Sequence, residues 1–125
     1  MIRIALLDDE KDQREATAAL LERYLSQHPE LSAQVRPFQS GYELLDAVER
    51  SGNFDLYLLD IVMPEQNGIE VGLSLRKLDG LGLIIYLTTS PDYAVDSYLT
   101  NAFHYLLKPV RWEQLVSVLD RAMDI

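Results

Sequence analysis

Short apolar runs alternate along the chain with longer amphipathic stretches. The runs are rich in Leu, Ile, Val and Tyr, and all but the second are nearly continuous in apolar character. A continuous run bounded by turn residues is typical of a strand that is covered on both faces. The pattern therefore predicts five strands, at residues 2–7, 33–38, 56–60, 83–87 and 102–107.

The stretches between these runs carry apolar residues at the helical period of 3.6. Helices are expected up to residues 27–29, from 40–41 to 51–53, over about 68–78, from 90–91 to about 100, and around Trp112 near the end of the chain. For the fourth of these, Ser90 is predicted as the N-cap and Pro91 as the first helical residue. Five strands that alternate with five helices predict an α/β fold with a parallel, doubly wound sheet and right-handed crossovers. Periodicity alone leaves the strand order open.

Length and composition narrow the class of protein. A chain of 125 residues is expected to form a single domain over residues 1–125, with any effector domain beyond its C-terminus. Cysteine is absent, which excludes disulfides and thiolate metal sites. The N-terminus turns acidic too soon for a secretory signal, and no apolar run reaches the length of a membrane span, so a cytoplasmic location is expected. The formal charge of −9 opposes direct binding of nucleic acid or anionic membrane.

Reactive side chains follow four of the five predicted strands. The first strand ends in Asp8 and Asp9, the third in Asp60, the fourth in Thr88 and the fifth in Lys108. Taken singly, each has an ordinary explanation: acids favoured at a helix N-terminus, a turn residue, a strand-end hydroxyl and a surface lysine. In a parallel sheet, however, the carboxyl ends of all strands lie at one edge, where such sheets bind ligands. The sequence therefore predicts that these five groups converge.

Converging carboxylates repel one another unless a cation is present. A hard divalent ion with oxygen ligands, Mg²⁺ in particular, suits a site of few carboxylates. A carboxylate beside Mg²⁺ and a lysine is suited to in-line attack on a phosphoryl group, which would give an aspartyl phosphate.

With these features the sequence resembles the receiver domain of two-component response regulators over nearly its whole length. Asp8-Asp9 is similar to the acidic pair of that family, residues 60–68 to its D-x-x-M-P-x-x-x-G phosphoacceptor motif, and Lys108-Pro109 to its Lys-Pro pair. Thr88 and Tyr105 stand where the family has its switch hydroxyl and switch aromatic. The resemblance implies a flavodoxin-like (βα)5 fold with strand order 2-1-3-4-5 and helices on both faces.

The resemblance also implies roles for individual residues. Asp60 would accept a phosphoryl group from a sensor histidine kinase. Mg²⁺ would be held by Asp9, Asp60 and the backbone carbonyl of Val62, with Asp8 acting through water.

Further roles concern the phosphoryl group and the switch. Lys108, aimed by a cis Lys-Pro bond, would pair with a phosphoryl oxygen. Thr88 would move to bond the phosphoryl group and let Tyr105 turn inward, which would reshape the surface of the fourth helix, fifth strand and fifth helix. The domain would be regulatory rather than an enzyme, and phosphorylation could form a homodimer.

The segment from Pro91 to Val110 is most similar to receivers that precede a LytTR-type DNA-binding domain, which would be the output in a longer protein. Three other interpretations compete. A haloacid-dehalogenase-like phosphatase normally has a second Asp two residues after the nucleophile, where this chain has Val62. A flavodoxin-like module would need a first loop rich in Ser, Thr and Gly rather than one that begins with Asp8-Asp9-Glu10. A pseudo-receiver scaffold would bind partners without being phosphorylated, although every active residue is present.

Overall fold

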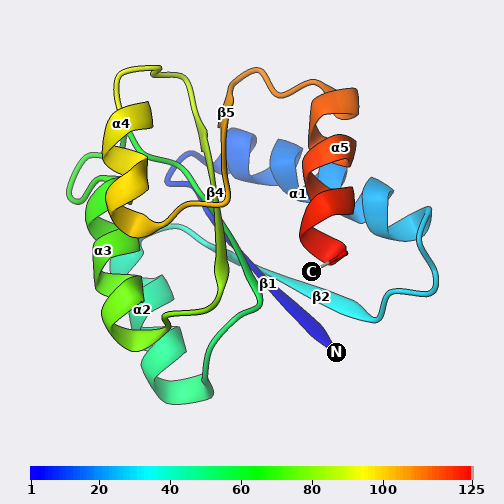
Figure 1. The fold of residues 1–125 in the computed structure, drawn as a ribbon, viewed down its shortest axis with the longest axis horizontal. Coiled ribbons are helices and arrows are strands. Elements are labelled where there is room, and N and C mark those ends of the chain that lie inside the picture. Colours follow the sequence, from blue (N-terminus) through cyan, green and yellow to red (C-terminus); the bar gives the residue numbers. More distant parts are fainter. Residues whose placement is uncertain (125) are drawn as a thin grey trace.

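The computed structural model describes residues 1–124 and has a central parallel sheet (Figure 1). Its order is β2-β1-β3-β4-β5, and every neighbouring pair is parallel. The predicted fold class and strand order are confirmed. The strands are β1 (Ile2–Leu7), β2 (Ala33–Phe38), β3 (Leu56–Leu59), β4 (Leu83–Thr88) and β5 (His104–Leu107).

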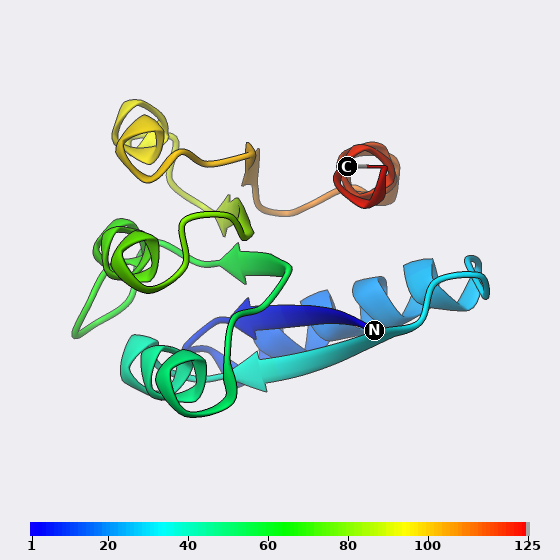
Figure 2. The ribbon, with the colours of Figure 1, turned by 60° about the horizontal axis from the view of Figure 1, so that its bottom comes forward.

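Helices cover both faces of the sheet (Figure 2). On one face lie α1 (Lys11–Ser26) and α5 (Trp112–Met123); on the other lie α2 (Gly41–Ser51), α3 (Gly68–Leu78), α4 (Ala94–Ser97) and the short 3₁₀ helix η1 (Tyr98–Thr100). Among the described residues, no helix combines the length and the apolar character that crossing a bilayer requires.

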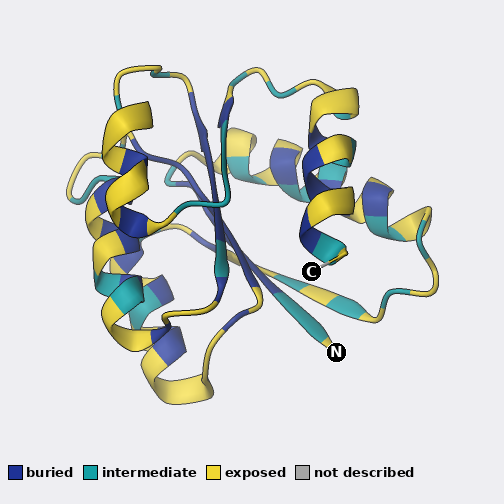
Figure 3. Ribbon diagram, viewed as in Figure 1, coloured by how far each residue is buried: buried dark blue, intermediate teal, exposed yellow. Residues whose placement is uncertain are grey.

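Alternation along the strands divides the core into two layers. Successive strand residues point to opposite faces, so Leu6 and Leu58 pack in the layer under α1 and α5. Their neighbours Leu7 and Leu59 pack in the layer under α2 and α3. Because both faces are covered, all of β3 and nearly all of β4 are buried, as Figure 3 shows in dark blue. This burial explains the continuous apolar runs in the sequence.

The predicted fourth helix is wrong in its start and its form. Ser90 is not the N-cap, because the N-cap position of the helix is Tyr93; the Ser90 hydroxyl accepts the Asp92 amide (3.2 Å) in a local turn before the helix. The α-helix begins only at Ala94, has no side-chain cap, and passes into η1 after one turn. A residue with φ of 52°, Asn101, then ends the segment.

The predicted start of the fifth strand is also corrected. Pairing in β5 begins at His104 rather than at Ala102. Phe103 donates its amide to the Ile84 carbonyl (2.7 Å) but lies before the paired segment. The remaining strand and helix boundaries agree with those predicted to within about one residue.

Candidate functional site

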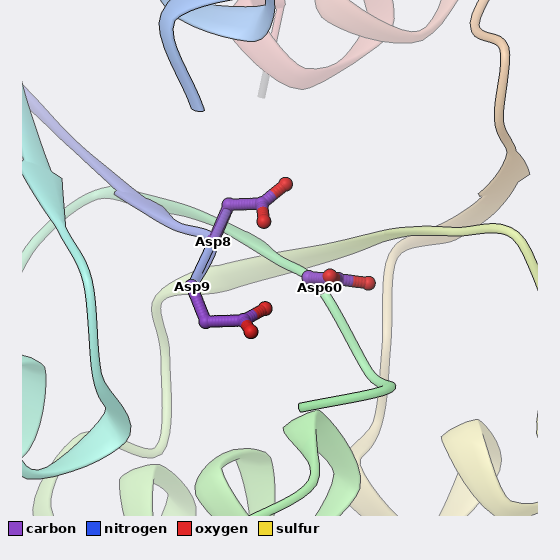
Figure 4. A group of neighbouring side chains, drawn as sticks. All are labelled: Asp8, Asp9 and Asp60. Carbon is purple, nitrogen blue, oxygen red and sulfur yellow. The ribbon is translucent and has the colours of Figure 1, made fainter. Parts of the chain in front are cut away.

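Three carboxylates meet at the carboxyl edge of the sheet, as predicted from the strand ends. Asp8 and Asp9 follow β1, and Asp60 follows β3, which pairs with β1 (Figure 4). One ligand atom from each lies within 4.8 Å of the others. Asp8 and Asp60 are only 2% and 7% exposed, so their carboxylates are largely desolvated.

Lys108 reaches this cluster from the segment after β5. Its ammonium Nζ lies 2.7 Å from Asp8 Oδ2 and 3.8 Å from Asp60 Oδ2. The Lys108-Pro109 peptide bond is cis, as the resemblance implied. Because Asp8 Oδ1 also accepts the Glu10 amide (3.0 Å), both oxygens of Asp8 are paired. In this structure the lysine is thus the counter-ion of Asp8 first and of Asp60 second.

The charge of the Asp60 carboxylate is only partly compensated. Burial raises the pKa of its carboxyl to about 6; the Lys108 ammonium opposes this rise, and the charge of Asp8 adds to it. Among the described residues, the hydrogen bond to this carboxylate comes to Oδ1 from the Ile61 amide (2.8 Å). A buried carboxylate with so few partners is stabilised by a bound cation, or by a reaction that transfers its negative charge to another group.

The Asp9 carboxylate indicates whether the site suits a metal ion. Its Oδ1 is buried and has no hydrogen-bond partner among the described residues. A buried carboxylate oxygen without a donor is costly, and a cation would compensate it. Since Mg²⁺ prefers oxygen ligands from one or two carboxylates and retains several waters, the three acids fit this ion.

An open hollow of about 280 Å³ lies beside Asp9. Its walls come from the start of α2, including Gly41 and Tyr42, and from the loop between β3 and α3, including Met63 and Gln66. The hollow gives solvent and small ions a path to Asp9. Val62, two residues after Asp60, belongs to the same loop and has a half-exposed side chain.

Thr88 and Tyr105 meet at the loop after β4. Thr88 is fully buried, and its Oγ1 accepts the Ser90 amide (3.3 Å). Tyr105, which is partly buried, donates its hydroxyl to the Ser90 carbonyl. The Lys108 amide also donates to the Thr88 carbonyl (2.8 Å). The two predicted switch residues and the lysine are therefore linked through one short stretch of backbone.

Two further residues of the site were not singled out from the sequence. Arg14 of α1 donates to the Asp8 carbonyl (2.8 Å) and so holds the loop after β1. At Gly68 an added Cβ would lie 2.0 Å from the Asp60 carbonyl oxygen, so only glycine allows α3 to begin against this backbone. The motif contained this glycine, but spacing could not reveal which atom it contacts.

Solved structures of known proteins support the fold. A response regulator receiver domain protein described as CheY-like, from Methanospirillum hungatei, has a TM-score of 0.84 and 26% sequence identity to this chain. The match covers 99% of this chain and 94% of that one.

Similar sequences carry related names. An uncharacterized response regulatory protein of Vibrio cholerae is 30% identical over 98% of this chain and 49% of its own length. The sensory transduction protein LytT of Bacillus cereus is 27% identical over 97% of this chain and 47% of its own length. The chain thus spans about half the length of these relatives. The family model for the response regulator receiver domain matches residues 4–120. This chain therefore belongs to the response regulator receiver domain family.

Proposed function

We propose that Asp60 accepts a phosphoryl group from a sensor histidine kinase and that the domain acts as a phosphorylation-controlled switch. The observation that carries this proposal is a buried carboxylate with a raised pKa, within 3.8 Å of a lysine ammonium and beside two further acids. Receiver domains are regulatory in general, and the domain would assist only its own phosphorylation and dephosphorylation.

The chemistry requires one bond to form and one to break. A carboxylate oxygen of Asp60 attacks the phosphorus of a phosphohistidine, and the P–N bond breaks with its electron pair passing to the imidazole. Burial restricts the nucleophile to one position, which lowers the entropic cost of attack. Lys108 lies close enough to neutralise a phosphoryl oxygen, after partial release from Asp8.

Mg²⁺ is the cofactor that these residues fit. It would be held by Asp9, Asp60 and the Val62 backbone carbonyl, with Asp8 acting through water, and when bound it supplies positive charge to the phosphoryl oxygens. The unpartnered Oδ1 of Asp9 supports its assignment as a direct ligand, and the two paired oxygens of Asp8 support an indirect role for that acid.

The switch is proposed to run through Thr88 and Tyr105 to the surface of α4, β5 and α5. Thr88 would turn toward the phosphoryl group, and Tyr105 would change its contact with the Ser90 carbonyl. The surface contains exposed apolar side chains, which suits a contact that forms or changes on activation, including a homodimer. These side chains are Val95, Tyr98, Leu99 and Leu107.

The output is proposed to lie in a second domain. Residues 1–125 would form the receiver, and the length of the relatives leaves room for a domain of similar size, such as a C-terminal LytTR-type DNA-binding domain. The charge of −9 argues against direct contact of the receiver itself with DNA or membrane. A cytoplasmic location is proposed, where a kinase could reach the domain.

The test is to incubate the protein with acetyl phosphate and Mg²⁺ and to weigh it intact. We expect the mass to rise by one phosphoryl group, and Asp60→Asn to abolish the rise. Asp46→Asn, which removes an exposed acid of α2 paired with Arg50, is the matched control and should be phosphorylated like the wild type. A mass that never rises with acetyl phosphate or the cognate kinase, or that still rises in Asp60→Asn, would overturn the proposal.

A further inference from the structure

The segment of α4 and η1, residues 94–100, is held to the rest of the molecule very differently at its two ends. We call this segment the α4 arm. Most of its side chains are exposed, and only Ser97 and Thr100 are buried. An exposed segment with a single helical turn has little stability of its own. Its position therefore depends on the contacts at its ends.

The C-terminal end is fixed by a directed chain of hydroxyl groups. The Tyr86 hydroxyl of β4 donates a hydrogen bond to Thr100 Oγ1 (2.8 Å), and the Thr100 hydroxyl donates to the Ser97 carbonyl (2.8 Å). Tyr86 and Thr100 are fully buried. Buried hydrogen bonds of this kind are costly to break, because no water replaces the lost partner.

The backbone of the same end is held by Arg76 of α3. Its guanidinium donates to the carbonyls of Thr100 (2.7 Å) and Asn101 (3.3 Å). It also donates to Gly82 (2.7 Å), in the loop before β4. One side chain therefore joins the end of the α4 arm to two other elements.

Helix α3 packs closely against this end. Gly72 of α3 faces the pair, and a Cβ there would lie 2.2 Å from the Tyr86 hydroxyl oxygen and 2.9 Å from Thr100 Cγ2. Helix α3 thus approaches as closely as a residue without a side chain permits. We call Arg76, Tyr86 and Thr100 together the anchor.

The N-terminal end has a much weaker attachment. Pro91, Asp92 and Ala94 are exposed, while Tyr93 is partly buried and packs against the core. Among the residues described, two side-chain hydrogen bonds join this end to the sheet: Thr88 Oγ1 accepts the Ser90 amide (3.3 Å), and the Tyr105 hydroxyl donates to the Ser90 carbonyl. Tyr105 is the Cα partner of Tyr86 in the neighbouring strand, and their ring centroids are 6.3 Å apart. Two adjacent tyrosines on one face of the sheet therefore hold the two ends of the arm.

We propose that Tyr86 is a positioning residue: with Thr100 and Arg76 it forms a fixed pivot, so that a change at Tyr105 swings only the N-terminal end of the α4 arm. The proposal goes beyond the function given above and rests on it only for the event that moves Tyr105. A rotation of Tyr105 breaks the bond to Ser90 and leaves the anchor intact. The arm then turns about Thr100, which displaces the exposed Val95 more than the residues next to the pivot.

Matched Tyr→Phe variants test the two attachments separately by hydrogen exchange, without any phosphorylation. Tyr105→Phe should raise exchange of amides in residues 90–95 by about fivefold, the effect of one lost hydrogen bond, and leave residues 99–103 within twofold of the wild type. Tyr86→Phe should have its main effect at residues 99–103. Both substitutions remove one oxygen atom from a tyrosine on this face, so each is the control for the other.

A double-mutant cycle identifies the bond responsible. Thr100→Val should raise exchange at residues 99–103, and Tyr86→Phe/Thr100→Val should raise it by less than the product of the two single effects. Fully multiplicative effects, or the same regional pattern in Tyr86→Phe and Tyr105→Phe, would overturn the proposal.

The wild type treated with acetyl phosphate and Mg²⁺ adds a check on movement. Exchange should change at residues 90–95 and stay within twofold at residues 99–103. A change of equal size at both ends overturns the pivot. Intact mass of the same sample separates this outcome from a failure of the proposed function: a mass that does not rise refutes phosphorylation at Asp60, while the variant comparison still decides the pivot.

Discussion

At the scale of single residues, the three acids of the site differ because they have different partners. Asp8 has both oxygens paired, one with Lys108 and one with the Glu10 amide. Asp9 keeps a buried oxygen without a donor among the described residues. Asp60 is nearly as buried as Asp8 but lies farther from the lysine. Three chemically identical side chains are thereby suited to hold a lysine, to bind a cation and to act as a nucleophile.

Asp60→Asn is expected to stabilise the protein when Mg²⁺ is removed by a chelator. The pKa of Asp60 is raised from 3.8 to about 6, so the folded state binds a proton more tightly than the unfolded state does. The wild type therefore carries a cost above pH 6 that is relieved as the pH falls through 6 towards 4. A shift of about two pKa units corresponds to about 3 kcal/mol as an upper value, and we expect a gain of about 1–3 kcal/mol for Asp60→Asn at pH 7.

Urea unfolding at pH 7 and at pH 5 measures this effect. The advantage of Asp60→Asn should shrink by about half at pH 5, where the folded wild-type carboxyl is largely protonated but the unfolded one is still ionised. Asp46→Asn, at an exposed position, should differ little from the wild type at either pH. An advantage that does not depend on pH would show that charge burial at Asp60 is not its cause.

At the scale of elements, prediction from sequence worked where burial alone determines the structure. The apolar runs of β1 and β4 are covered on both faces, so their hydrophobic character matches their position. Prediction failed after Ser90, where local hydrogen bonds rather than burial determine the backbone conformation. The Ser90 hydroxyl bonds within a turn, and the following segment is held through Thr100 by Tyr86 and Arg76, which lie outside it in the sequence.

The candidate site was predictable for a similar reason. Parallel strands bring their carboxyl ends together, so Asp8, Asp9, Asp60 and Lys108 were expected at one edge before any contact was known. Pairing within the site was not predictable, because the 2.7 Å contact of Lys108 with Asp8 depends on side-chain directions that periodicity does not encode.

Gly68→Ala is expected to destabilise the junction between β3 and α3. The added Cβ would lie 2.0 Å from the Asp60 carbonyl oxygen and 2.9 Å from Ile61 Cα, and neither backbone atom can move without displacing the loop. Overpacking typically costs about 1–3 kcal/mol, and a contact with backbone is expected at the upper end of this range. The change should also slow phosphorylation, since it moves the residue that carries the nucleophile.

Gly80→Ala is the matched control, because a Cβ there would meet nothing within 4 Å. Urea midpoints should fall clearly for Gly68→Ala and stay close to the wild-type value for Gly80→Ala. Equal midpoints for the two variants would mean that the loop after Asp60 adapts easily, contrary to the close approach in the structure.

At the scale of the whole molecule, Mg²⁺ should couple the site to global stability. A ligand that binds only the folded state stabilises it by RT ln(1 + [L]/Kd), about 2.7 kcal/mol at a hundredfold excess over Kd. The gain in Tm should be larger at pH 7.5 than at pH 5, because Asp60, with a pKa of about 6, must lose its proton to act as a ligand.

Sodium chloride at matched ionic strength separates this binding from general screening. With a charge of −9, the domain is stabilised somewhat by any salt, since screening weakens repulsion among its acids. Asp9→Asn, which removes the unpartnered carboxylate oxygen, should keep the response to sodium and lose most of the response to Mg²⁺. If the two salts raise the Tm of the wild type equally, Mg²⁺ acts only through screening, and the three acids do not form a specific ion site.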